Sequence, residues 1–344
     1  MKFQEDIINW LLEDNNPPVK YLTLKNLLLK KDTDPEVIKA KSNLMEYTVT
    51  KNILKHSDDF LKHDDKAYWK YKGKYWQIIF LGQFLADGND KRIKKGVEQI
   101  LKKIQSDSKK WWMCLTANLL TALMKLGYKN NSIVIEETEN LAKRFIDEKG
   151  INCDGINYSL LNQCYMALPK LLLCFAEINI DKRSLSVKKA IKLITKTLIE
   201  KEVYIYVPEN RKQWQNILTN QPHRSELPKG STVKAWVLKQ KKEFLNSKGL
   251  GSRDSKKGWL KFGFPLNYNS DILEAMYALA KAGSSMNKKL QDPLDIIVQK
   301  MNKGGKWILE NSLNGKMLED VEEKGEPSKW LTYYSLFILN NFSV

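Results

Sequence analysis

The chain has 344 residues, of which 42% are hydrophobic and 10% aromatic. A disordered polymer would not carry this much apolar and aromatic surface, so the composition is that of a folded protein. Lysines and arginines number 57 against 40 aspartates and glutamates, which gives a formal net charge of +17. This charge favours anionic partners, although the lysines form no compact basic block and a compositional bias toward lysine is the alternative explanation.

The sequence lacks the patterns of a disulfide scaffold, a secretory signal and a membrane span. Four cysteines, at positions 114, 153, 164 and 174, are too few for a disulfide scaffold in a chain of this size. The first residues, MKFQEDIINWLLED, carry acidic side chains where a secretory signal needs a basic and then an apolar run. No stretch approaches the roughly 20 apolar residues of a membrane span. We therefore expect a reduced, cytoplasmic protein with no transmembrane segment.

Apolar residues recur along most of the chain with the period of helices, and strand patterns are scarce. The predicted helices come in pairs, in which the first helix is apolar nearly all round and the second is one-sided and charged. The first member should therefore be buried and the second should lie outside. The predicted pairs turn near residues 32–34, 87–90, 127–131, 179–181 and 283–285, and WLTYYSLFILNNF adds a last helix of the buried type.

Repeated helix pairs can stack as a solenoid or close into a ring, and closure leaves a central cavity. Residues 203–258 break the pattern with three prolines, polar turns and scattered aromatic residues, which predict a long irregular insertion. Such insertions are functional loops or padding between repeats. The whole chain, 1–344, is interpreted as one domain.

Two segments carry motifs of a known superfamily. QSDSKKW keeps Gln105 and Trp111, and MNKGGKW keeps Gly305 and Trp307, of a Gln-x-x-x-Gly-x-Trp pattern. In this respect the chain resembles the α/α-toroid superfamily of terpenoid cyclases and protein prenyltransferase β subunits. The resemblance implies an all-α fold, an α/α toroid in which a closed ring of helix pairs surrounds a central cavity.

A closer similarity is to uncharacterised prokaryotic proteins related to prenyltransferases and squalene cyclases. It rests on the segments CLTAN (114–118), KGINC (149–153), WLKFGFPLNYNSDILEA (259–275) and GEPSKWLT (325–332). The similarity covers most of the chain outside 203–258. It indicates the fold but attaches no reaction to this chain.

The resemblance also implies a zinc site, because the prenyltransferase zinc is held by Asp, Cys and His. Cys114 falls at the position of the family's zinc cysteine, but Trp112 replaces the aspartate and Asn162 the histidine. Cys153 and Cys164 can substitute as ligands, with Asp154 and Asn162 as polar neighbours. The alternative is that these cysteines are small buried hydrophobes.

The Asp-x-Asp-Asp and Asp-Asp-x-x-Asp motifs of terpene cyclases and synthases are absent, as are Gly-rich phosphate loops. Aromatic residues near the starts of the buried helices are the other candidates for a site. In a closed ring they would line an isoprenoid pocket or stabilise a carbocation, or else they staple neighbouring repeats together. The candidates are Trp76, Trp112, Tyr158, Tyr165, Phe264, Tyr268 and Trp330.

The leading hypothesis is a terpenoid cyclase-like or prenyltransferase-like protein that binds an isoprenoid or other apolar ligand in a central cavity. The alternative is a non-enzymatic toroid scaffold that binds a protein or anionic partner through its basic surface. Nucleic-acid binding through the net charge is a third and weaker hypothesis, for which affinity would fall steeply with salt.

Overall fold

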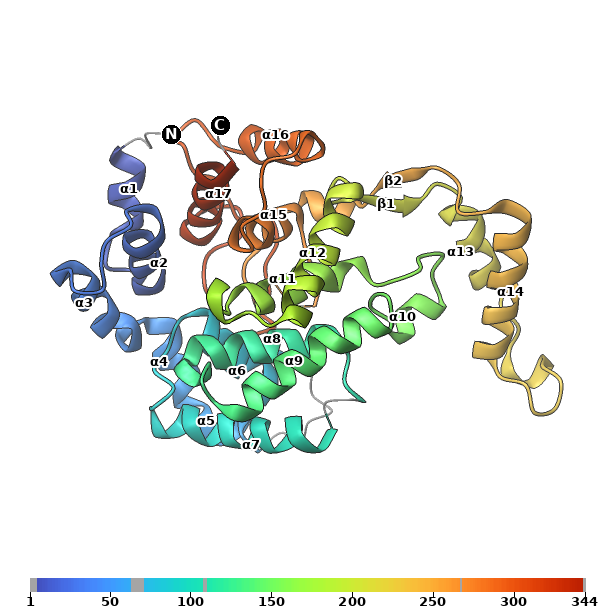
Figure 1. Ribbon diagram of the computed structural model, residues 1–344, viewed down its shortest axis with the longest axis horizontal. Coiled ribbons are helices and arrows are strands. Elements are labelled where there is room, and N and C mark those ends of the chain that lie inside the picture. The colour runs from blue at the N-terminus through green and yellow to red at the C-terminus, as the bar shows by residue number, and fades with distance from the viewer. Residues whose placement is uncertain (1–4, 63–70, 108–109, 267, 343–344) are drawn as a thin grey trace.

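The protein is mostly helical, as expected for the all-α class (Figure 1). The computed structural model describes residues 5–62, 71–107, 110–266 and 268–342. The strands within these ranges are short and form two antiparallel pairs. The pairs are β1 (Ile205–Pro208) with β2 (Arg253–Ser255), and β3 (Trp307–Ile308) with β4 (Pro327–Ser328).

Within the described ranges, five apolar helices form the centre of the core. They are α6 (Lys74–Gln83), α8 (Met113–Leu123), α11 (Leu168–Ala176), α15 (Ile272–Lys281) and α17 (Lys329–Phe342). Each helix packs against the next in this order. In α6 every residue from Tyr75 to Gly82 is buried, as expected for a helix that is apolar all round. The prediction that the first helix of each of these pairs is buried is confirmed.

Four amphipathic helices cover this core. They are α7 (Lys91–Asp107), α9 (Ser132–Asp147), α12 (Leu185–Glu200) and α16 (Gln291–Gln299). In α7 the buried residues Ile93, Val97, Ile100 and Ile104 recur at helical spacing, and the lysines between them face away from the core. These helices follow the predicted turns, so this part of the pairing is also confirmed.

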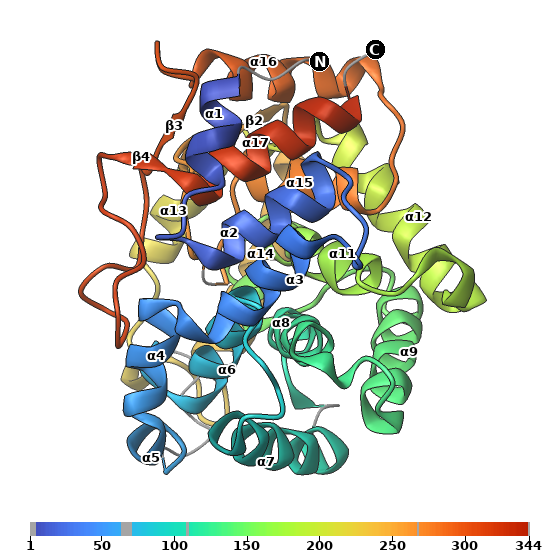
Figure 2. The same cartoon turned by 90° about the vertical axis from the view of Figure 1, so that its left-hand side faces the viewer.

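The N-terminal helices are α1 (Glu5–Leu11), α2 (Pro17–Leu22), α3 (Pro35–Ser42), α4 (Thr48–Lys55) and α5 (Ser57–Phe60). Of these, α1 and α2 lie beside the last helix, α17, whereas α4 and α5 lie toward α6 and α7 (Figure 2). A π-helical turn, η1 (Thr23–Leu27), continues α2 and contacts α17. Within it, the Asn26 amide donates a 2.7 Å hydrogen bond to the Tyr333 hydroxyl.

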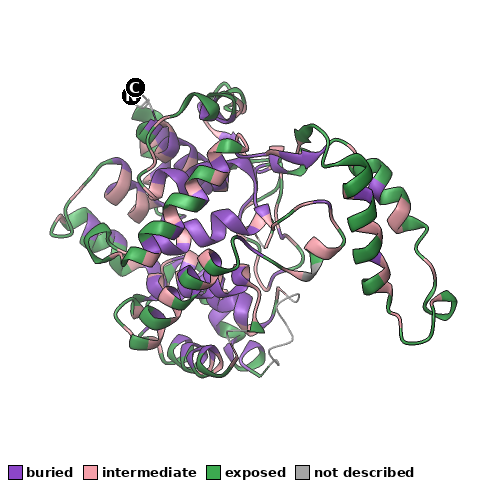
Figure 3. Ribbon diagram, turned by 45° about the vertical axis from the view of Figure 1, so that its right-hand side comes forward, coloured by how far each residue is buried: buried purple, intermediate pink, exposed green. Residues whose placement is uncertain are grey.

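The insertion at 203–258 is more regular than the sequence indicated. It contains α13 (Arg211–Thr219) and α14 (Val233–Lys248), which extend away from the other helices (Figures 1 and 3). We call α13 and α14 the arm. Because only Val237 and Phe244 of α14 are buried among many lysines, its helical pattern was too weak to detect in the sequence.

The arm has a small core of its own. Trp214 and Phe244 make an edge contact with ring centroids 5.7 Å apart. Leu160 joins them from the described residues outside the arm, which we call the helical body. The Trp214 indole nitrogen donates a 3.1 Å hydrogen bond to the Tyr158 carbonyl. The Lys241 ammonium donates to the Ile156 carbonyl, 2.9 Å away. These contacts fix the arm to the segment that contains Cys153 and Cys164.

None of the helices in the described ranges is long and apolar enough to cross a membrane.

Candidate functional site

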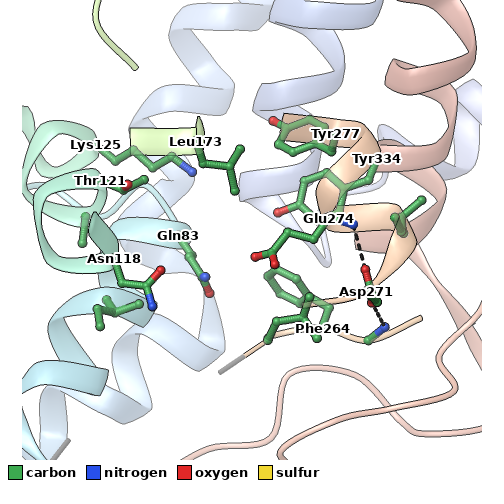
Figure 4. A pocket seen from close by; sticks show the side chains of 15 residues that line it. Gln83, Asn118, Thr121, Lys125, Leu173, Phe264, Asp271, Glu274, Tyr277 and Tyr334 are labelled. Carbon is green, nitrogen blue, oxygen red and sulfur yellow. Dashed lines mark hydrogen bonds between the residues drawn. The ribbon is translucent and has the colours of Figure 1, made fainter. Parts of the chain in front are cut away.

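Two hollows have the features of a small-molecule site. The first, which we call the inner cavity, lies between the apolar helices and has a volume of about 60 Å³ (Figure 4). One wall carries the amide and ammonium side chains, and the opposite wall carries the carboxyl and phenol side chains. The first wall includes Gln83, Asn118, Thr121 and Lys125, and the second includes Phe264, Asp271, Glu274, Tyr277 and Tyr334.

Asp271 is the N-cap of α15 and is 2% exposed. Its Oδ1 accepts a 2.7 Å hydrogen bond from the backbone N–H of Glu274, and its Oδ2 accepts a 2.9 Å bond from that of Gly263. Burial raises the pKa of Asp271 to about 7, and the nearby Glu274 carboxylate acts in the same direction. Asp271 can therefore both donate and accept a proton near neutral pH.

Buried ion pairs surround this acid. The Lys170 ammonium, with a side chain that is 3% exposed, bonds to Oε1 of Glu274. The other carboxylate oxygen of Glu274, Oε2, is buried and has no hydrogen-bond partner among the described residues. A buried carboxylate oxygen without a partner is costly, so it marks a point where a ligand or water would be favoured.

A second group joins α8, α11 and α15. The Lys281 ammonium bonds to Oε1 of Glu177, and the Lys125 ammonium lies 3.8 Å from the same oxygen. Burial would raise the pKa of Glu177, but Lys281 and Lys125 together bring it below its usual value. Burial lowers the pKa of Lys125, and the Lys281 charge lowers it further against the opposing effect of Glu177. The Glu177 carboxylate is thus shared between the Lys281 ammonium, which bonds to it, and the Lys125 ammonium, which lies farther away.

The second hollow, which we call the arm cleft, lies where the arm meets the helical body and has a volume of about 260 Å³. Its lining is mainly aromatic and aliphatic. Tyr165 and Tyr206 stack there with ring centroids 4.6 Å apart. The lining includes Ile156, Tyr158, Leu160, Leu161, Tyr165, Met166, Tyr206, Val207, Pro208, Trp214 and Leu218.

Two cations also line the arm cleft. These are Arg211, at the start of α13, and Lys256, just after β2. Burial lowers the pKa of Lys256, and the positive charge of Arg211 lowers it further. Within the described residues, neither cation forms an ion pair, and the charge that acts on Lys256 is that of Arg211. The arm cleft is therefore apolar along its walls and carries positive charge at one place, where no described carboxylate is paired with it.

The structure brings the three candidate zinc cysteines into one region. The thiols of Cys153 and Cys164 share a hydrogen bond, and Cys114 is close enough to act electrostatically on Cys164. The bond to Cys153 raises the pKa of the Cys164 thiol, and burial raises it further. Cys153 and Cys164 line the arm cleft, and Asn162 accepts a 3.2 Å hydrogen bond from the Tyr165 hydroxyl.

Among the described residues, this arrangement does not form a complete zinc site. Zinc binds thiolates, and without a metal ion the environment of Cys164 favours the protonated thiol. In the part of the chain that the structure describes, no group of three or more His, Cys, Asp or Glu side chains is placed to hold a metal ion. The side chain of Asp154 lies outside the described residues. Zinc binding stays a prediction, and we derive no chemistry through a metal.

The aromatic candidates are distributed over different places. Phe264 lines the inner cavity, and Tyr158 and Tyr165 line the arm cleft. Trp76 and Trp330 are fully buried core residues; Trp330 stacks on Phe264 at 4.2 Å. Trp112 is the half-buried N-cap of α8, and Tyr268 is half-buried before α15.

The sequence did not identify the charged residues that line or adjoin the two hollows. Lys125, Lys170 and Glu274 stand in segments that are otherwise apolar, such as LLTALMKLGY and YMALPKLLLCF. A charged residue in a helix that must be buried is the signal that identifies them, because such charges are rare unless paired. For Arg211 and Lys256 the sequence contains no comparable signal.

The comparisons with known proteins add no family. No family model matches the chain, and no curated protein or solved structure matches it. The similarity to α/α-toroid proteins that the motifs indicate stays a prediction.

Proposed function

We propose that the protein binds an amphipathic small molecule in the arm cleft, with an apolar chain between the aromatic walls and an anionic head on Arg211 and Lys256. The observation that carries this proposal is the combination of an apolar cleft with two neighbouring cations that have no carboxylate partner among the described residues. Pockets of this kind are mostly apolar and use a few polar groups to fix the orientation of the ligand.

The volumes favour the arm cleft over the inner cavity for such a ligand. A cavity of about 150 Å³ accepts benzene, so 260 Å³ holds about ten carbon atoms. The 60 Å³ of the inner cavity is too small for an isoprenoid chain. The proposed ligand is therefore a prenyl phosphate or diphosphate of about two isoprene units, and its place differs from the central cavity that the sequence indicated.

The same proposal includes an α/α-toroid fold for the helical body. In its support, the apolar helices contact one another in the order α6, α8, α11, α15 and α17. Phe84, at the end of α6, then contacts Trp330 of α17 with ring centroids 6.1 Å apart, which links the last of these helices to the first.

Calorimetric titration with geranyl diphosphate tests the proposal. We expect micromolar binding to the intact protein, and a loss of about tenfold or more when Arg211→Gln and Lys256→Gln are combined, since each removes a charged contact. Lys212→Gln is the matched control, because Lys212 is the exposed neighbour of Arg211 on α13 and is not among the residues lining the arm cleft.

A second variant tests the apolar part of the cleft. Leu218→Trp fills the space between α13 and the 153–166 segment, so it should abolish binding of geranyl diphosphate while the helical content stays unchanged. Equal affinity for decanoate would assign the site to acyl chains instead. If inorganic diphosphate bound as tightly as geranyl diphosphate, the apolar walls would contribute nothing, and the scaffold hypothesis with a basic surface would be favoured.

A further inference from the structure

The inner cavity contains a lysine whose surroundings suit covalent chemistry. We propose that Lys125 forms an imine with a small aldehyde or ketone in the inner cavity, independently of any ligand in the arm cleft. The inner cavity of about 60 Å³ has room for a carbonyl compound of about two to four carbon atoms.

The position of Lys125 supports a nucleophilic role. Lys125 belongs to a π-helical turn, η5 (Met124–Tyr128), that continues α8, and its side chain points into the inner cavity (Figure 4). Lys281 occupies Glu177, which leaves the Lys125 ammonium 3.8 Å from the nearest carboxylate oxygen in the described chain, beyond hydrogen-bond distance. The Lys125 side chain is largely buried, with 21% of it exposed. A lysine that is shielded from water beside a second cation is a recognised arrangement for imine formation, because both effects favour the neutral amine.

The opposite wall supplies an acid and a base. Asp271 is an acid that holds its proton near neutral pH, and Glu274 presents a buried oxygen, Oε2, without a partner. Tyr277 and Tyr334 face the same space, and burial raises the pKa of both phenols well above the usual value. A carbonyl compound in the inner cavity would thus lie between an amine and proton-transferring carboxyl groups.

The reaction balances without an oxidant or a cofactor. The neutral Lys125 amine attacks the carbonyl carbon, and Asp271 gives a proton to the carbonyl oxygen. Glu274 accepts the proton that the nitrogen releases and returns it to the hydroxyl of the carbinolamine, which leaves as water. The iminium nitrogen then gives its remaining proton to Asp271, so the neutral imine forms and both carboxyl groups end in their starting states. One carbon–nitrogen double bond forms, and one water leaves.

Trapping with cyanoborohydride tests the proposal on the intact protein. With acetone as the probe at pH 7, an isopropyl group should appear on Lys125 in peptide mass spectra. Labelling of Lys125 should be at least about tenfold faster than that of Lys129, an exposed lysine four residues away. Cyclohexanone is too large for the inner cavity, so it should show no preference for Lys125.

Two variants distinguish an activated Lys125 amine from one that is merely accessible to the probe. Lys281→Met leaves Glu177 to pair with Lys125 alone, so labelling of Lys125 at pH 7 should fall about tenfold for each unit by which its pKa rises. The other charged groups around Lys125, which are Asp271 and Glu274, are unchanged by this variant. Asp271→Asn removes the acid and should slow labelling as well.

Labelling of Lys125 in the intact protein that is no faster than that of Lys129 would overturn the proposal. A preference for Lys125 that persists unchanged in Lys281→Met would show that access alone, and not an activated amine, causes the reaction. Geranyl diphosphate binding to the arm cleft does not enter this test, so the two proposals can fail separately.

Discussion

Asp271 combines a structural and a chemical role in one side chain. As the N-cap of α15 it satisfies two backbone N–H groups, and as a buried acid it has a pKa of about 7. Its usual pKa is about 3.9. Between about pH 4 and pH 7 the folded state therefore keeps a proton that the unfolded state has released. Because the folded state binds more protons, this group lowers stability as the pH rises through that window.

Denaturant titrations of the protein and of Asp271→Asn between pH 4 and pH 7 measure this effect. Relative to the variant, the protein should lose up to about 4 kcal/mol of unfolding free energy across the window, at 1.36 kcal/mol for each pKa unit. The changed contact to the Gly263 N–H would shift the variant's free energy of unfolding by the same amount at every pH. Such a shift does not change how the difference between the two free energies varies with pH. Parallel curves would show that Asp271 ionises normally.

The thiols are predicted to be slow to react. Burial raises the pKa of Cys174 to about 12, and the hydrogen bond to Cys153 together with burial raises the pKa of Cys164. Since the thiolate is the nucleophile, iodoacetamide at pH 8 should modify both at least about tenfold more slowly in the folded protein than in urea. Fast modification of Cys164 in the folded state would contradict the environment described.

The close packing of α6 against α8 depends on one glycine. A Cβ added at Gly82 would lie 2.6 Å from the Cα of Ala122, which is backbone and cannot turn aside. A Cβ at Gly96 of α7 would instead meet the flexible ends of Ile78 and Leu61, at 2.9 and 3.0 Å. The two glycines therefore form a matched pair of test positions.

Gly82→Ala should lower the free energy of unfolding by about 1–3 kcal/mol, because the two helices must separate. Gly96→Ala should change it by less, since alanine gains up to about 1 kcal/mol of helix propensity to offset the small rearrangement. Chemical denaturation of both variants gives the comparison. Equal losses would mean that backbone contact does not set the distance between α6 and α8.

Helix pairing could be predicted because burial imposes it on the sequence. The apolar character of α6 and the one-sided pattern of α7 follow directly from where their faces lie. The arm could not be predicted this way, because α14 buries few residues. The residues of the two hollows could not be predicted either. Lys125 approaches Glu177, and Arg211 approaches Lys256, only through tertiary packing between distant segments.

At the scale of the whole molecule, the arm and the helical body are joined through few contacts. Trp214 is central, because it packs in the core of the arm and bonds to the Tyr158 carbonyl. Trp214→Ala should loosen the arm and abolish ligand binding in the arm cleft, while the inner helices stay folded. Hydrogen exchange should accelerate in α13 and α14 and remain unchanged in α8; equal acceleration in α8 would show one cooperative unit.

The central claim, that the arm cleft is the ligand site, is tested most directly by photolabelling. Geranyl diphosphate with a diazirine on the prenyl chain should label peptides within 153–166 and 206–218, which form the walls of the cleft. Excess unmodified geranyl diphosphate should suppress this labelling. Labelling that falls instead on residues 118–125 and 271–277 of the inner cavity, or that spreads over the surface without competition, would contradict the account.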